Sequence, residues 1–396
     1  MKLTRDALFR DGDAARLRML AVVVGLAVAA GCDSGSDAPA PAELADAPQD
    51  TAPADTTPAD PAAGAPFQAL YDQGVDRYQG VFSPMLAESL PGGVITWAFD
   101  GSDNGPLCFT GGRFTMSTRD GSSSELMIFL QGGGACSEDG CGAVDVAPPG
   151  IPAFGILDPD RSTNPAASYN VGYLPYCDGT FFSGDRDVDS DGDGRHDRFF
   201  RGVQNLAASL DVIVGRYPAP SRILLAGNSA GGFGTHYALP IVRKLYPDVP
   251  IDLVNDSGVG ILAPGVLDDL TEYWNAGTWY PASCETCLGE DGHLTDYHSY
   301  QLAEDEDVRM AFLSYTQDDV VLATLPTSAG EWEGELLAAM AELREAYPTR
   351  FRSLIAGGDG HTFIIRDLDR PVGGVTVAQW IADMLSGSEA WVSVSD

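Results

Sequence analysis

The stretch Ile223-Leu-Leu-Ala-Gly227-Asn228-Ser229-Ala230-Gly231-Gly232 decides the fold class of this 396-residue chain. Its apolar first half predicts a buried β-strand, and the residues after Ser229 predict a helix. A Gly-x-Ser-x-Gly sequence between a strand and a helix is typical of a nucleophile elbow, in which the serine hydroxyl projects over the end of a sheet. Ser229 is therefore the candidate nucleophile, and the alternative is an ordinary turn serine.

Short apolar runs alternate with helical patterns through the chain after residue 66. The runs cover residues 125–130, 222–226, 251–254, 308–315 and 352–356, and the helical patterns cover 203–214, 231–245, 329–347 and 375–385. This alternation favours an α/β fold, with a mainly parallel central sheet covered by helices on both faces. Ligands of such sheets bind beyond the carboxyl ends of the strands, so the chemistry is expected directly after the apolar runs.

A serine nucleophile needs a base, and the base needs an acid that orients it. His361 directly follows the last apolar run and is the candidate base. Asp318 follows the preceding run and is the favoured acid, with Asp319 and Asp256 as alternatives. The remaining histidines lie in loops or in a helix: His196, His236, His293 and His298. The sequence therefore predicts a triad of Ser229, His361 and Asp318.

The apolar run 125–130 leads into Gln131-Gly-Gly-Gly134-Ala135-Cys136. Consecutive glycines let backbone N–H groups converge on one oxygen atom, which is the requirement of an oxyanion hole. We therefore expect the N–H groups of Gly133 and Gly134 to act together with that of Ala230. The alternative is a plain strand-to-loop turn.

Several blocks in the same order resemble the family of pectin acetylesterases and Notum carboxylesterases. They are 130–136 with its glycines and cysteine, Tyr176-Cys-Asp-Gly-Thr-Phe-Phe-Ser-Gly-Asp185, Phe200-Arg-Gly202, 227–232 and Asp256-Ser-Gly258. The resemblance implies an α/β-hydrolase-like serine esterase with the triad and oxyanion donors named above. It also implies disulfides Cys108–Cys177 and Cys136–Cys141. Three residues depart from the family pattern (Gln131, Ala135 and Asn228), so the resemblance carries the mechanism further than the substrate.

Six cysteines follow Cys32, and an even number in an exported protein indicates disulfides, most simply three. The separation of Cys136 and Cys141 suits a small loop, and Cys284 and Cys287 could form another. A redox or zinc role for this second pair is the alternative.

The N-terminal 31 residues resemble a bacterial lipoprotein signal peptide, with five basic residues, an apolar run at 19–30 and Gly31 before Cys32. Cys32 would carry the lipid, and an ordinary signal peptide cleaved nearby is the alternative. Residues 32–66, rich in Pro, Ala and Asp, are expected to form a disordered tether. The esterase domain then spans 67–396. We expect an exported protein anchored to a bacterial membrane at the cell envelope or surface.

An acidic loop with the spacing of a calcium site lies between 187 and 199. Asp189, Asp191, Asp193 and Asp197 occupy positions 1, 3, 5 and 9, with the Arg195 carbonyl at position 7. The terminal bidentate Glu is missing, so a structural calcium site outside the EF-hand class is expected. The alternative is a solvated acidic loop. Catalysis by a serine triad requires no cofactor.

The formal charge of −34 excludes nucleic acid as a partner, because binding to phosphates requires a basic face. It also favours neutral acetylated substrates over anionic pectin. The predicted function is an exported, monomeric esterase that hydrolyses O-acetyl esters on carbohydrate. One alternative is a carboxylesterase or lipid deacylase with the same triad. The other is a non-catalytic, calcium-stabilised surface binding protein.

Overall fold

The computed structural model describes residues 64–138, 140–288, 293–325 and 327–396. The predicted signal peptide, the lipidation site Cys32 and nearly all of the predicted tether therefore lie outside the described residues. Among the helices that are described, none is long and apolar enough to cross a bilayer.

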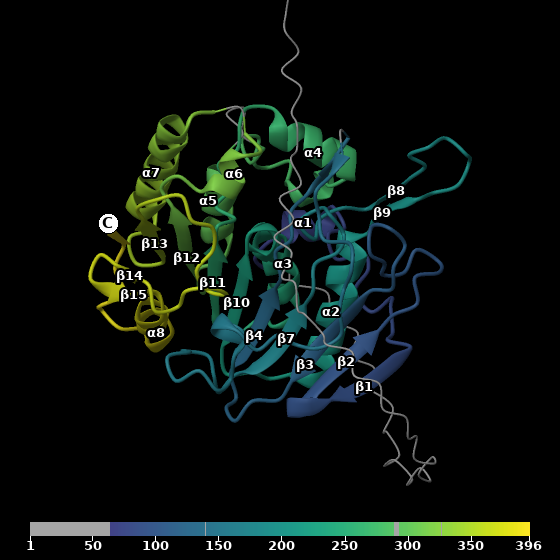
Figure 1. Cartoon of the computed structure of the whole chain (residues 1–396), viewed down its shortest axis with the longest axis horizontal. Helices are drawn as coiled ribbons and strands as arrows, with labels where there is room; N and C mark the ends of the chain where they lie inside the picture. The colour runs from purple at the N-terminus through teal and green to yellow at the C-terminus, as the bar shows by residue number, and fades with distance from the viewer. Residues whose placement is uncertain (1–63, 139, 289–292, 326) are drawn as a thin grey trace, which may run out of the picture.

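A ten-stranded sheet forms the centre of the molecule, in the order β1-β2-β3-β7-β4-β10-β11-β12-β13-β16. From β7 to β16 every neighbouring pair is parallel, whereas β1, β2, β3 and β7 pair antiparallel. Figure 1 shows β4, β10, β11 and β12 side by side. The strands span Leu86–Leu90 (β1), Val94–Ala98 (β2), Thr115–Arg119 (β3), Asn170–Leu174 (β7), Leu126–Leu130 (β4), Ile223–Asn228 (β10), Ile251–Asp256 (β11), Val308–Tyr315 (β12), Phe351–Ala356 (β13) and Val394–Ser395 (β16).

The two faces of the sheet are covered differently. One face packs against a large core to which α2, α3, α5 and α7 contribute, and the other against a smaller core formed with α8 and the loops around residues 156 and 364. The α/β fold with helices on both faces is thus confirmed. The helices are Gln68–Asp72 (α1), Gly202–Arg216 (α2), Ala230–Leu245 (α3), Val266–Trp274 (α4), Thr295–Glu304 (α5), Asp319–Leu322 (α6), Ala329–Ala346 (α7) and Val377–Ser386 (α8).

Three short hairpins and three disulfides complete the fold. The hairpins are Cys136–Ser137 with Gly140–Cys141 (β5, β6), Arg186–Val188 with Arg198–Phe200 (β8, β9), and Pro371–Val372 with Val375–Thr376 (β14, β15). Disulfides join Cys108 to Cys177, Cys136 to Cys141 and Cys284 to Cys287. The first links positions 69 residues apart, so it stabilises the fold by about 4 kcal/mol through the entropy of the unfolded chain.

Candidate active site

Ser229 lies in a strained turn between β10 and α3. Its backbone has φ 54° and ψ −123°, and its N–H donates to the carbonyl of Asp256 at 2.7 Å. A Cβ on Gly227 would lie 2.1 Å from the Gly231 carbonyl oxygen, and one on Gly231 would lie 2.0 Å from that of Leu130. Only glycine permits these approaches, so the local sequence fixes the sharp turn that presents Ser229.

His361 follows β13 and Asp318 follows β12, and the two side chains are joined by a hydrogen bond. The Nδ1 atom of His361 lies 2.7 and 2.9 Å from the two carboxylate oxygens of Asp318. Asp318 is fully buried, and its Oδ1 also accepts from the N–H groups of Val320 and Val321 at the start of α6. Because a carboxylate only accepts hydrogen bonds, Nδ1 carries the proton, which leaves Nε2 as the basic nitrogen.

A cavity of about 600 Å³ brings the candidate nucleophile and base together, since Ser229 and His361 both line it. Its walls include Phe181 and Phe233, whose rings stack at 4.4 Å with an interplanar angle of 9°. The other apolar lining comes mainly from the segments that contain α4 and α6: Leu262, Val266, Leu270, Val320, Val321 and Leu325. The charged side chains that line it are Glu138, Arg186, Asp269 and Glu272. An apolar group of moderate size fits beside the nucleophile.

The glycine loop after β4 packs directly on the elbow. The N–H of Gly132 donates to Asn228 Oδ1 at 3.3 Å, and a Cβ on Gly132 would lie 2.3 Å from the Asn228 carbonyl oxygen. Gly134 has φ +83° and lines the cavity together with Ala230. The carbonyl of Gly133 accepts from Val144 N at 2.8 Å, which ties the loop to the β5–β6 hairpin segment. Two of the predicted oxyanion donors, Gly133 and Gly134, thus belong to a loop that touches the candidate nucleophile's turn, and the third, Ala230, begins α3.

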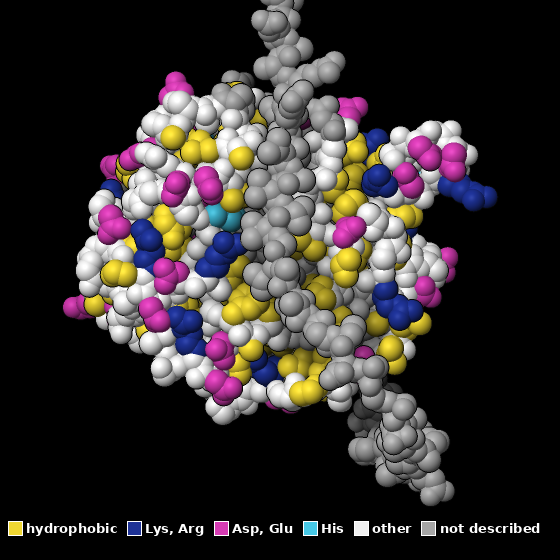
Figure 2. All heavy atoms as spheres, in the orientation of Figure 1, with side chains coloured by type: hydrophobic (Ala, Val, Ile, Leu, Met, Phe, Trp, Pro, Cys, Tyr) yellow, Lys and Arg dark blue, Asp and Glu magenta, His cyan; other side chains and the backbone are white. Residues whose placement is uncertain are grey.

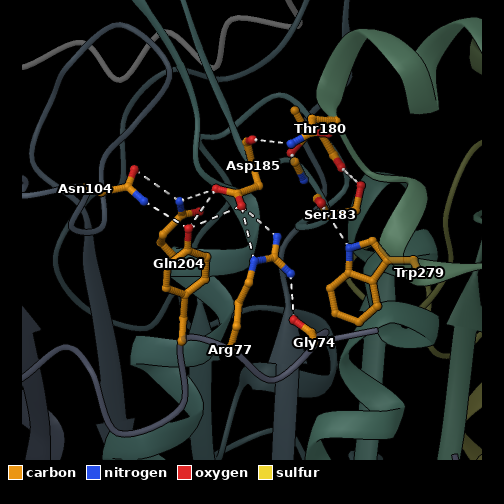
Figure 3. A network of polar contacts seen from close by, with 11 residues as sticks. Gly74, Arg77, Asn104, Thr180, Ser183, Asp185, Gln204 and Trp279 are labelled. Atoms are coloured by element: carbon orange, nitrogen blue, oxygen red, sulfur yellow. Dashed lines mark hydrogen bonds and ion pairs between the residues drawn. The ribbon is translucent and has the colours of Figure 1, made fainter. Parts of the chain in front are cut away.

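The cavity wall at Phe181 is held by a polar network that the sequence did not indicate. Asp178 is fully buried, and its Oδ2 accepts from the backbone N–H of Thr180 and of Phe182 at 2.9 and 3.2 Å. Four residues beyond Phe181, Asp185 accepts from Arg77 Nη2 at 2.7 Å and from Gln204 Nε2 at 2.6 Å. Figure 3 shows this carboxylate between the two side chains, with the loop of Thr180 and Ser183 beside it. These contacts fix Phe181 although its φ of 56° is unfavourable.

Among the described residues, Asp318 is the acid that binds the imidazole ring, and the two alternative acids bind backbone groups nearby. Asp319 begins α6, and its N–H donates to the carbonyl of Asp359. Asp256 is fully buried at the end of β11, and its carboxylate accepts from the backbone N–H groups of Phe363 and Ile364. Burial raises the pKa of the Asp256 carboxyl to about 7.

The other histidines are placed in different surroundings. His236 and His298 are buried with ring centroids 4.0 Å apart, and His236 Nδ1 lies 2.8 Å from Gln301 Oε1. Burial lowers the pKa of His236 to about 4, so this side chain is neutral at pH 7. His293 Nε2 lies 3.6 Å from a carboxylate oxygen of Glu335. His196 is exposed on the β8–β9 hairpin.

The acidic loop lies at the tip of the β8–β9 hairpin. Asp189, Asp191 and Asp193 present carboxylate oxygens within 4.8 Å of one another. The fourth predicted side chain, Asp197, instead accepts from the N–H and the hydroxyl of Ser190, at 2.9 and 2.6 Å. Figure 1 shows the hairpin extending away from the body of the molecule, and its acidic side chains are visible in Figure 2. Only the base of the hairpin, at Arg186, reaches the cavity.

Comparison with known proteins finds a family that is similar to part of the chain. The family model described as pectinacetylesterase matches residues 100–268. This segment contains the glycine loop, the Tyr176-Cys-Asp-Gly block and Ser229, whereas Asp318 and His361 follow it. No curated protein sequence matches the chain. Over these residues the chain is similar to the pectinacetylesterases, and it is a carboxylic ester hydrolase.

Proposed function

We propose that the chain hydrolyses O-acetyl esters of carbohydrate through a triad of Ser229, His361 and Asp318. The observation that carries the triad is the hydrogen bond between His361 and the buried carboxylate of Asp318, since the His361 ring lines the same cavity as Ser229. The acetyl group is supported by the match of residues 100–268 to the pectinacetylesterase family. The carbohydrate part of the substrate rests on the family's resemblance alone.

The mechanism proceeds through an acyl-enzyme. His361 Nε2 takes the proton of the Ser229 hydroxyl, and the serine oxygen attacks the ester carbonyl carbon. The oxyanion that forms accepts from the N–H of Ala230 and from those of Gly133 and Gly134. The alcohol leaves with the proton from His361. Water then attacks the acyl group with His361 as base, which releases the carboxylic acid and restores Ser229.

Asp318 keeps its charge against Nδ1–H of His361 throughout both steps. It fixes the tautomer in which Nε2 is the base and stabilises the imidazolium while the proton resides on the ring. The bonds from the N–H groups of Val320 and Val321 to Oδ1 hold the carboxylate in place and leave Oδ2, 2.7 Å from Nδ1, to the imidazole.

A second candidate function is hydrolysis of esters with a longer apolar acyl group, as a carboxylesterase or lipid deacylase. The volume and lining of the cavity favour it, because about 600 Å³ bounded by Phe181, Phe233 and aliphatic side chains exceeds what an acetyl group fills. Both candidates use the same triad, so they differ only in the acyl group accepted.

The cellular setting in this proposal comes from the sequence alone. A lipid on Cys32 anchors the mature chain to a bacterial membrane, and residues 33–66 hold the esterase domain away from it. These residues lie outside the described part of the chain.

Hydrolysis of p-nitrophenyl acetate by the wild type, Ser229→Ala and Asp318→Asn tests the triad. We expect kcat to fall by about 10⁴-fold or more in both variants, because the nucleophile or the tautomer of its base is lost. Ser209→Ala serves as the matched control, since this buried serine lies in α2 and bonds only to the Asn205 carbonyl. Equal rates for the wild type and Ser229→Ala would leave the binding-protein alternative.

A panel of acyl groups separates the two candidates. Faster Ser229-dependent release from p-nitrophenyl acetate and acetylated xylan than from the octanoate ester supports the acetyl esterase. A preference for octanoate supports the second candidate instead.

A further inference from the structure

Asp256 makes contacts with both halves of the proposed catalytic apparatus. Its carbonyl oxygen accepts from the N–H of Ser229 at 2.7 Å. Its side-chain Oδ2 accepts from Phe363 N at 2.7 Å and from Ile364 N at 2.8 Å. One residue at the end of β11 therefore binds the nucleophile's turn through its backbone and the segment after His361 through its carboxylate.

Ser257 extends the same contact by one residue. Its Oγ accepts from the N–H of Thr362 at 3.1 Å. Residues 256 and 257 thus bind three consecutive backbone N–H groups, at positions 362, 363 and 364. Thr362 directly follows His361, so the contacts of residues 256 and 257, at the end of β11, hold the backbone next to the base.

The backbone is strained on both sides of the contact between Ser257 and Thr362, and such strain persists only where neighbouring contacts enforce it. Ser257 has φ +60° and Thr362 has φ +65°, both in the left-handed region that side chains other than glycine disfavour. The turn after β11 is further held by Asn255, whose Oδ1 accepts from Gly258 N at 2.9 Å and whose Nδ2 donates to Gly258 O at 2.8 Å. In its ionised form the Asp256 carboxylate makes stronger hydrogen bonds to N–H than a neutral acceptor does.

We propose that Asp256, assisted by Ser257, is a positioning residue that holds the base His361 in register with the nucleophile Ser229. The inference rests on the proposed triad and assigns a separate task to each acid. Asp318 orients the imidazole ring through Nδ1, and Asp256 orients the backbone segment next to it. Without the acceptor at position 256, two buried N–H groups lose their partner and the segment moves to find another.

The test compares Asp256→Ala with Asp256→Asn, using p-nitrophenyl acetate and a burst titration that counts active molecules. In Asp256→Ala we expect kcat per active molecule to fall by about 100-fold, because a displacement near 1 Å of a catalytic group has that effect. KM changes by less than about threefold, since the acyl cavity is untouched. Asp256→Asn keeps a carbonyl acceptor in place, so we expect its kcat per active molecule to be at least about tenfold higher than that of Asp256→Ala.

Asp252→Ala is the matched control, because Asp252 lies on the same strand at its other end. It is also buried, and it pairs with Arg222 and Arg309 rather than with the site. Its loss lowers the melting temperature and leaves kcat per active molecule near that of the wild type. If Asp256→Ala behaves like Asp252→Ala, or if its defect lies in KM alone, the proposal is overturned.

Ser257→Ala decides the question if Asp256→Ala does not fold. This variant removes the acceptor for Thr362 N and the 3.5 Å bond from Ser257 Oγ to Asp256 Oδ1. We expect kcat to fall by about tenfold at nearly constant KM. An unchanged kcat overturns the proposal. A Ser229→Ala protein that stays active instead refutes the triad itself, so the two failures are distinguishable.

Discussion

Backbone strain in this molecule gathers at single residues around the candidate active site. The described residues include nine non-glycine residues with positive φ. Five of them belong to the nucleophile's turn, the cavity wall or the base's loop: Ser229, Phe181, Phe182, Ser257 and Thr362. Such conformations persist only where neighbouring contacts enforce them. A buried acid lies beside each of these three regions. Asp178 accepts a backbone N–H at the cavity wall. Asp256 accepts one from the base's loop through its carboxylate and one from the nucleophile's turn through its carbonyl.

Burial of a single carboxylate on α2 gives stability a measurable pH dependence. Asp211 accepts from Gly80 N at 2.8 Å, and burial raises its pKa from 3.8 to about 6. The folded protein therefore binds this proton more tightly than the unfolded chain does. The corresponding stability is fully present below pH 3.8 and is lost as the pH rises through 6.

We expect Asp211→Asn to remove this loss, because the amide keeps an acceptor for Gly80 N and carries no charge. Thermal unfolding at pH 8 should give a higher melting temperature for the variant than for the wild type. The difference should shrink as the pH is lowered toward 4. A difference that is the same at both pH values would contradict the assignment.

At the scale of single residues, sequence could indicate some of the site and not the rest. Ser229, Asp318 and His361 each follow an apolar run. In the structure Ser229 and His361 line the same cavity, and Asp318 binds the imidazole of His361. The contacts of Asp256 were not visible, since its backbone partners lie 107 and 108 residues away and backbone donors leave no mark in a sequence. The sequence did contain one signal for the cavity wall at Phe181, namely the pair Phe181-Phe182 directly after Cys-Asp-Gly-Thr.

At the scale of elements, the β8–β9 hairpin separates the acidic loop from the catalytic chemistry. Its tip carries three clustered carboxylates, and its base meets the cavity at Arg186. The loop also contains Arg195 and Arg198, at which trypsin cuts. The rate of trypsin cleavage at the tip therefore measures how rigid the loop is.

We expect Ca²⁺ to slow trypsin cleavage after Arg195, because an ion between Asp189, Asp191 and Asp193 would close the loop. Chelation with EGTA should restore the rate. Asp191→Asn should abolish the protection, whereas Asp103→Asn, on another loop, should retain it. Equal cleavage rates with Ca²⁺ and with EGTA would show that the loop is a solvated acidic turn.

Among the elements, five of the parallel strands could be predicted, whereas β7, β16 and the antiparallel edge could not. Strands β4, β10, β11, β12 and β13 are buried nearly throughout, so their sequences are continuous apolar runs. Strand β1 is exposed at four of its five residues, and β3 reads Thr-Met-Ser-Thr-Arg. Neither has the apolar pattern from which a strand can be inferred. The alternation of apolar runs with helical patterns therefore predicted half of the strands of the sheet.

At the scale of the whole molecule, negative charge distinguishes possible substrates. The chain has 57 acidic and 23 basic residues, and Glu138, Asp269 and Glu272 line the cavity together with Arg186. Figure 2 shows acidic groups at many places on the face in view, interspersed with fewer basic ones. Such a field repels polyanions and leaves neutral substrates unaffected.

We expect kcat/KM for acetylated pectin to rise when the ionic strength is raised from about 0.01 to about 0.15 M, because the Debye length falls from about 30 to about 8 Å. The value for p-nitrophenyl acetate should stay constant over the same range. In Glu272→Gln the salt effect on pectin should be smaller. A rate for pectin that falls with added salt would mean that its anionic backbone is attracted instead.

The order of the strands also determines when hydrolysis becomes possible during synthesis. Strands β10, β11, β12 and β13 join the sheet one beside the next in chain order, so the nucleophile is placed first and the base last. A nascent chain that has reached α4 holds Ser229 without an acid or a base. Parallel pairing over such long separations is also slow. Activity should therefore emerge with the final folding phase, once β13 has docked and residues 362–364 have met β11.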